Sequence, residues 1–179
     1  MKPNDIIREF DKFLTKRGAS FTGVAIGGAP LNLLGIIFRE TRDCDIIDPV
    51  IPDKIQSLAK EFAEQVRLGG NILADDWLNN GPISMKDKLP SAWEKRLVPA
   101  FKGKALALYT LERQDLLKTK LQGLCDRGMD KADCIAMRPS KEELRAAIPW
   151  LKDQDENPDW PKHVEGALAD LAKDLGYEL

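Results

Sequence analysis

Two aspartates separated by one residue, Asp43 and Asp45, are well suited to bind a metal ion. They open an apolar run that predicts a strand over residues 43–47, and side chains at i and i+2 of a strand point to the same face. Two neighbouring carboxylates repel each other unless a cation lies between them. Mg²⁺ is the usual cation at such a pair when nucleotide phosphates supply further ligands. The pair therefore predicts a magnesium site, which Mn²⁺ could also fill.

A pair of glycines, Gly27 and Gly28, lies earlier in the same stretch, between a predicted strand and a predicted helix. Glycines at the start of a helix let a phosphate approach the backbone amides. Glycine pairs occur in many turns, and short acidic pairs are often exposed strand ends, so each signal is weak by itself. Their combination over residues 27–45 predicts a site for a phosphate and a metal ion.

The pattern Arg39-x-Thr41-x-Asp43-x-Asp45, with the preceding glycine pair, resembles the nucleotidyltransferase superfamily. The closer resemblance is to the bacterial branch that contains the AbiEii-type abortive-infection toxins and related uncharacterised nucleotidyltransferase-like proteins. It implies that Asp43 and Asp45 are catalytic metal ligands. The nucleotide-binding residues that it implies in this block are Gly27, Gly28, Arg39 and Thr41. A structural role fits Arg39 and Thr41 equally well.

Residues 111–137 continue this resemblance. In the related proteins a lysine on a helix is followed by an arginine and an Asp-x-x-Asp pair, which match Lys120, Arg127, Asp130 and Asp133. The resemblance implies that Lys120 and Arg127 bind the nucleotide. It also implies catalytic roles for Lys120, Asp130 and Asp133.

Helical geometry supports the choice of Lys120. On a helix over residues 112–126, Lys120 falls within the arc of Leu116, Leu117 and Leu121. A lysine in an apolar arc must find a partner or reach a cleft. The functional hypothesis is therefore a phosphate-binding Lys120, and the alternative is a structural lysine paired with Asp130 or Asp133.

The strand predicted over residues 105–109 departs from the superfamily pattern. Many members carry a third carboxylate on a later central strand, whereas this segment reads Ala-Leu-Ala-Leu-Tyr. Asp130 or Asp133 could replace that carboxylate, since the closer relatives carry an acidic pair there. Otherwise the metal site is incomplete, and a catalytically inactive nucleotide-binding or protein-interaction module on the same fold becomes the alternative. A third alternative is an unrelated α+β protein with a coincidental acidic pair.

The predicted strands are concentrated in the first part of the chain. They cover residues 21–26, 43–47, 71–74 and 105–109, and the predicted helices cover residues 4–17, 29–37, 53–66, 112–126, 141–152 and 161–175. This order predicts an α+β, α/β-like fold with flanking helices, and the resemblance implies that its sheet is a nucleotidyltransferase-type mixed sheet. We expect a core over residues 1–110 and a helical C-terminal part over residues 111–179 that packs on the core as a single compact unit.

Composition argues against several other classes of protein. The net charge of −2 provides no overall basic field for nucleic acid, and the apolar runs are too short to cross a bilayer. We therefore expect a cytoplasmic protein without a membrane partner. The three cysteines are scattered and lack CxxC spacing, which argues against a disulfide framework or a zinc site. The single histidine, His163, leaves little material for histidine-dependent catalysis.

The charge distribution bears on which molecule could accept a nucleotidyl group. Residues 86–104 hold six cations and two carboxylates, while residues 141–179 hold five cations and ten carboxylates. Two solvated surfaces account for this asymmetry, and the sharper hypothesis is that the basic segment binds a polyphosphate or an RNA. The resemblance implies an NTP donor and leaves tRNA, a protein or a small molecule as the acceptor. A toxin with an antitoxin partner is one role that such relatives take.

Several other residues have structural interpretations. Trp77 and Trp93 could stack on a base, but tryptophans in small domains more often pack in the core. Cys44 alternates with the two aspartates, so we expect it to be buried rather than reactive. Ser140 and Glu143 have the spacing of a capping box at a helix start.

Overall fold

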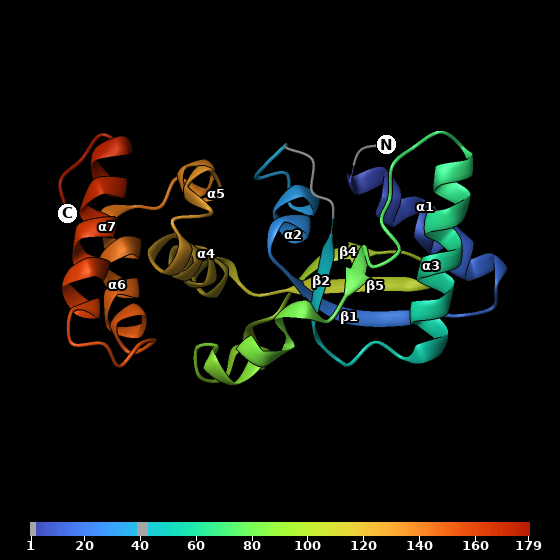
Figure 1. Cartoon of the computed structure of the whole chain (residues 1–179), viewed down its shortest axis with the longest axis horizontal. Coiled ribbons are helices and arrows are strands. Elements are labelled where there is room, and N and C mark those ends of the chain that lie inside the picture. Colours follow the sequence, from blue (N-terminus) through green and yellow to red (C-terminus); the bar gives the residue numbers. More distant parts are fainter. Residues whose placement is uncertain (1–2, 39–42) are drawn as a thin grey trace. The chain divides into compact units, whose positions relative to one another are not determined.

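The computed structural model describes residues 3–38 and 43–179 (Figure 1). The chain divides into two compact units. One comprises Met1–Asp87 and Glu94–Leu111, and the other comprises Lys88–Trp93 and Glu112–Leu179. The strands that the structure describes all belong to the first unit, and the second unit is helical. The short segment Lys88–Trp93 groups with the helical unit, although the residues on both sides of it in the sequence belong to the first unit.

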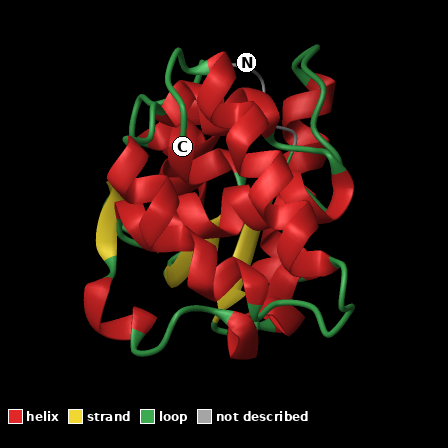
Figure 2. Ribbon diagram, turned by 90° about the vertical axis from the view of Figure 1, so that its left-hand side faces the viewer, coloured by secondary structure: helices red, strands yellow, loops and turns green. Residues whose placement is uncertain are grey.

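A five-stranded mixed sheet forms the centre of the first unit, and Figure 2 shows its strands in yellow. The strands are β1 (Phe21–Ile26), β2 (Cys44–Asp48), β3 (Leu78–Asn79), β4 (Val98–Lys102) and β5 (Leu106–Thr110). Their order in the sheet is β3-β2-β1-β5-β4. β1 is parallel to β5 and antiparallel to β2, while β3 is parallel to β2 and β4 is antiparallel to β5. The prediction of an α+β fold with a mixed sheet and flanking helices is confirmed.

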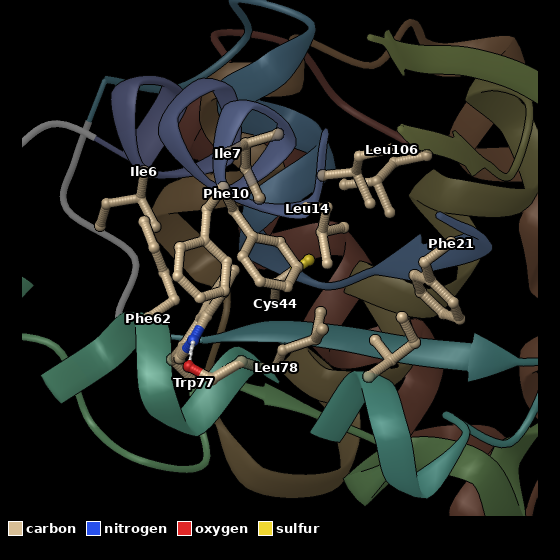
Figure 3. Close-up of a cluster of buried hydrophobic side chains, with 14 of the residues drawn as sticks. Ile6, Ile7, Phe10, Leu14, Phe21, Cys44, Phe62, Trp77, Leu78 and Leu106 are labelled. Carbon is tan, nitrogen blue, oxygen red and sulfur yellow. Dashed lines mark hydrogen bonds between the residues drawn. The ribbon is translucent and has the colours of Figure 1, made fainter. Parts of the chain in front are cut away.

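Three helices pack with this sheet: α1 (Pro3–Lys16), α2 (Gly28–Leu33) and α3 (Asp53–Leu68). α1 and α3 contact each other (Figure 1). Their apolar residues form one core with residues of the strands. Phe10, Phe62 and Trp77 meet in this core, with the rings of Phe10 and Trp77 edge to face at 5.0 Å (Figure 3). Trp77 Nε1 donates to the carbonyl of Ala59 at 3.1 Å, which satisfies the indole N–H. Trp77 belongs to this core, and Trp93, which groups with the second unit, is also buried, as the packing interpretation predicts.

β2 presents different chemistry on its two faces. Cys44 and Ile46 point into the core, where they are 2% and 0% exposed. Side chains alternate along a strand, so Asp45 lies on the opposite face of the sheet. Burial raises the pKa of Cys44 to about 12, and the nearby charges of Asp45 and Asp43 add to the effect. The predicted burial of Cys44 is confirmed, and the raised pKa agrees with an unreactive thiol.

Asp11 of α1 fixes the turn between β4 and β5. Its carboxylate accepts hydrogen bonds from the amides of Lys104 at 3.2 Å, and of Ala105 and Leu106 at 2.8 Å each. A Cβ at Gly103 would collide with the carboxylate, so a larger residue there would push the Asp11 side chain away from these amides. This contact ties the first helix to a hairpin that is distant in the sequence.

Four helices make up most of the second unit: α4 (Arg113–Arg127), α5 (Lys131–Met137), α6 (Lys141–Lys152) and α7 (Trp160–Asp174). α4 packs against the other three. Its first residue, Arg113, donates to Glu143 at 2.7 Å and to the carbonyl of Met137 at 2.8 Å, which links α4 to the start of α6. The capping box of Ser140 and Glu143 is present, as predicted. None of the helices within residues 3–38 and 43–179 is long and apolar enough to cross a membrane.

Some predicted elements were wrong. Residues 71–74 form no strand, and the strand beside β2 is instead the two-residue β3. The helix predicted over residues 29–37 ends at Leu33, because Gly35 adopts a φ of +71° and the next amide bonds back to Leu31. β4 and α5 were not predicted. The turn-rich segment between β3 and β4 holds the 3₁₀ helices η1 (Gly81–Lys88) and η2 (Trp93–Arg96).

Candidate functional site

Three segments of the first unit meet at one end of the sheet. Ile26, the last residue of β1, is opposite Asp45 of β2, and Asp45 is in turn opposite Asn79 of β3. The glycine turn after β1 therefore lies beside the start of β2. The structure thus brings Gly27 and Asp45 together, although eighteen positions separate them in the sequence.

The Asp45 carboxylate is half-buried and has a neighbour at each oxygen. Asn79 donates its Nδ2 proton to Oδ1 at 3.2 Å. On the other side, a Cβ at Gly27 would lie 3.0 Å from Oδ2, and Gly27 has a φ of +82°. The turn backbone can therefore approach the carboxylate this closely because residue 27 is glycine. Gly28 begins α2, which has no acidic residue in its first turn.

Asp43 is exposed and immediately precedes β2. Within residues 3–38 and 43–179, no group of three or more His, Cys, Asp or Glu side chains is arranged to hold a metal ion. Magnesium in nucleotide sites is commonly bound by one or two carboxylates together with substrate phosphates. A magnesium site at Asp43 and Asp45 therefore stays a prediction, and it would need phosphate oxygens as further ligands.

Two residues of the predicted motif, Arg39 and Thr41, lie outside the described residues. The strand β5, which runs beside β1, carries no carboxylate between Leu106 and Thr110. The third carboxylate that many superfamily members carry on a central strand is thus missing from this position.

The second predicted cluster belongs to the helical unit. Lys120 of α4 is 5% exposed, and its Nζ lies 3.0 Å from Oδ1 of Asp130 and 2.8 Å from Oδ2 of Asp133. Asp133 is 1% exposed, and Asp130 precedes α5 with a φ of +65°. The structure therefore brings these three residues together and contains the ion pairs that the structural alternative for Lys120 requires. The nucleotide-binding and catalytic roles of Lys120, Asp130 and Asp133 stay predictions.

Arg127, the last residue of α4, is exposed. Its Nε lies 3.8 Å from a carboxylate oxygen of the adjacent Asp126, which is a weak surface contact. Its predicted role in nucleotide binding also stays a prediction.

The histidine and the cysteines are hydrogen-bonded or buried. Nε2 of His163 donates to the carbonyl of Cys125 at 2.7 Å. All three cysteines are buried free thiols. Burial raises the pKa of Cys125 to about 11 and that of Cys134 to about 12, so neither forms the reactive thiolate at neutral pH.

Sequence reasoning missed Asn79 because it lies in a two-residue strand within a turn-rich segment. The run Asn79-Asn80-Gly81 is typical of a turn, and only the pairing of β3 with β2 reveals the contact with Asp45. Asn80 anchors the same segment differently, because it donates to backbone carbonyls, those of Ile46 at 2.8 Å and Pro49 at 3.1 Å.

The family described as "Nucleotidyltransferase of unknown function (DUF6036)" matches residues 4–141 of this sequence. The chain belongs to this family. The match covers the glycine turn, the aspartate pair and the segment from Lys120 to Asp133. Membership in DUF6036 supports the predicted nucleotidyltransferase superfamily, and the description of DUF6036 specifies neither the substrates nor the branch. No curated protein and no solved structure matches the chain.

Proposed function

We propose that the protein is a Mg²⁺-dependent nucleotidyltransferase that moves a nucleotidyl group from an NTP to an RNA, protein or small-molecule acceptor. The observation that carries the proposal is the close approach of Gly27 to Asp45 in a chain of a nucleotidyltransferase family. At this site the backbone of Gly27, which has no side chain, lies beside the Asp45 carboxylate, and the Asn79 amide donates a hydrogen bond to that carboxylate. A triphosphate bound along that backbone would have its phosphates next to the metal ligands.

In this proposal Asp43 and Asp45 hold the metal, and the backbone at Gly27 and Gly28 contacts the phosphates. Mg²⁺, with Mn²⁺ as a substitute, would neutralise phosphate charge and lower the pKa of the attacking hydroxyl. The acceptor oxygen forms a bond to the α-phosphorus while the bond from that phosphorus to the bridging oxygen breaks. Pyrophosphate leaves, and the hydroxyl proton passes to water.

Lys120 is not essential to this proposal. Two carboxylates within 3.0 Å compensate its charge, so the contacts favour a structural role over direct phosphate binding. A contribution of Lys120, Arg127, Asp130 or Asp133 to catalysis is a separate hypothesis that rests on the resemblance.

The basic segment suits an RNA acceptor. Lys95, Lys102 and Lys104 have exposed side chains that could contact a phosphate backbone. Membership in the AbiEii-like branch, tRNA as the acceptor and a toxin role with an antitoxin partner are further parts of the proposal, and the resemblance supports them.

A second candidate function is a non-catalytic nucleotide-binding or protein-interaction module on the same fold. Two observations favour it: β5 lacks a carboxylate, and the described residues contain no group of three potential metal ligands. Such a module would bind an NTP without releasing pyrophosphate.

Incubation with each NTP labelled at the α-phosphate, Mg²⁺ and total RNA or lysate tests these candidates. A transferase attaches label to an acceptor, and the signal disappears in Asp43→Asn and Asp45→Asn. NTP binding that survives both substitutions, without transfer, favours the module. A protein that binds neither NTP nor metal contradicts the transferase and the nucleotide-binding module, and leaves only the protein-interaction module.

A further inference from the structure

We infer that Asn79 is a positioning residue that orients the Asp45 carboxylate for metal binding. This inference rests on the proposed function. Asn79 lies opposite Asp45 across the β2–β3 pairing, and its Nδ2 donates to Asp45 Oδ1 at 3.2 Å. Its Oδ1 accepts the amide proton of Gly81 at 2.6 Å.

These two contacts fix the orientation of the Asn79 amide. If the amide were reversed, its oxygen would face the Asp45 carboxylate and its NH₂ group would face the N–H of Gly81. Both contacts would then be repulsive, since each would bring together two acceptors or two donors. Asn79 therefore holds its donor toward Asp45, and Asp45 loses rotational freedom.

Gly81 is part of this arrangement. A Cβ at position 81 would lie 2.8 Å from Oδ1 of Asn79, which is closer than real Cβ contacts allow. A side chain there would displace the amide from its position between Gly81 and Asp45. The Asp45 carboxylate thus lies between the Asn79 amide and the Gly27 backbone. Partners that orient a metal ligand in this way typically change metal affinity by about 10–100-fold when they are replaced.

Asn80 provides a matched control. It anchors the same segment by donating to the carbonyls of Ile46 and Pro49 and by accepting the amide proton of Ile51 at 2.8 Å. Its replacement should loosen the segment without removing the donor to Asp45. A general structural effect would therefore appear in both variants, whereas a positioning effect would appear in Asn79 variants alone.

The experiment compares wild type, Asn79→Leu, Gly81→Ala and Asn80→Ala. Free Mn²⁺ is titrated by electron paramagnetic resonance in the presence of an uncleavable NTP analogue, and the Mg²⁺ concentration for half-maximal transfer is measured in parallel. Asn79→Leu and Gly81→Ala should weaken Mn²⁺ binding and raise the Mg²⁺ requirement by about tenfold or more. Asn80→Ala should leave the Mn²⁺ affinity and the Mg²⁺ requirement within about twofold of wild type, even where it lowers the melting temperature.

Unchanged metal affinity in Asn79→Leu and Gly81→Ala, or an equal shift in Asn80→Ala, would overturn the inference. Gly81→Ala keeps the Asn79 side chain, so it carries the test if Asn79→Leu does not fold. Metal binding that depends on Asn79 in a protein without transfer activity supports the positioning role and counts against the transferase. Transfer with a metal requirement independent of Asn79 supports the transferase and overturns the positioning role.

Discussion

Gly27 and Asp45 are packed so closely that a β-carbon at position 27 would lie 3.0 Å from Oδ2 of the carboxylate. Gly27 also has a φ of +82°, which L-residues with side chains rarely adopt. Both the turn and the carboxylate beside it therefore favour glycine at this position. Gly35, in the loop after α2, has the positive φ without the close neighbour. Its φ is +71°, and a β-carbon there would have no atom within 4 Å.

Replacement of Gly27 by alanine is expected to impair activity as well as stability. Gly27→Ala and Gly35→Ala should each lose about 1–2 kcal/mol from the positive φ. Only Gly27→Ala should also lower the rate of nucleotidyl transfer, by about tenfold or more, because the new methyl group displaces the Asp45 carboxylate. Thermal melts and initial rates of both variants check this expectation. Equal rates in the two variants would show that the contact with Asp45 is irrelevant to activity.

Asp11 is expected to make the free energy of unfolding depend on pH in the acidic range. Burial alone would raise the pKa of Asp11, but the amides of Ala105, Leu106 and Lys104 outweigh it and hold the pKa below its ordinary value. The stabilisation is therefore complete above the unfolded pKa of about 4 and is lost as the pH falls through the lower folded value. Asp11→Asn should cost about 1 kcal/mol at neutral pH, and the difference from wild type should shrink below about pH 4. Denaturant unfolding across this range measures it, and a difference that grows toward acidic pH would contradict the assignment.

Gly103→Ala is expected to mimic the loss of Asp11. A β-carbon at this position would collide with the Asp11 carboxylate, so the side chain must leave the amides that it caps. The double variant Asp11→Asn/Gly103→Ala should be little less stable than either single variant, since both remove the same contact. Gly166→Ala is the control, because Gly166 lies within α7 with no atom near its β-carbon position, and alanine should stabilise the helix there by about 0.5–1 kcal/mol. Additive losses in the double variant would show that the two positions act independently.

Lys120 is expected to contribute to stability through Asp133. Lys120→Met leaves a carboxylate that is 1% exposed without this cation, which should cost about 3–5 kcal/mol. Lys131→Met removes a pair of similar length, 2.6 Å to Asp174, whose side chains are exposed, so it should change stability little. Chemical denaturation compares the two variants. Unchanged stability in Lys120→Met together with loss of NTP binding would instead support the phosphate-binding hypothesis.

Local patterns predicted much of the secondary structure. The strand at residues 21–26 and the helix at residues 141–152 have the predicted bounds, because apolar spacing and a capping box define them within a few residues. The burial of Lys120 also followed from helical spacing. β4 was missed because Pro99 interrupts its pattern at the edge of the sheet, and α5 because it is only seven residues long.

The candidate site was predictable only where it is local in sequence. The glycine turn and the aspartate pair come from one short stretch, and the antiparallel β1–β2 pairing brings them together. Asn79 enters through two residues of strand pairing, which leave no periodic signal in the sequence. The pairing of Lys120 with Asp130 or Asp133 was one of two predicted alternatives, and helical spacing could not decide between them because Asp130 adopts a left-handed conformation in the loop between α4 and α5.

The most direct test of the central claim is metal-dependent transfer by Asp45→Asn. The substitution keeps the size of the side chain and removes the charge that would bind Mg²⁺. Asp48→Asn is the matched control, since Asp48 lies on the same strand and its carboxylate is 2.5 Å from Lys86 Nζ. The account predicts that wild type and Asp48→Asn transfer label from an NTP at similar rates. Asp45→Asn should be slower by at least about a hundredfold while melting as a folded protein. Transfer by Asp45→Asn at the wild-type rate would contradict the account.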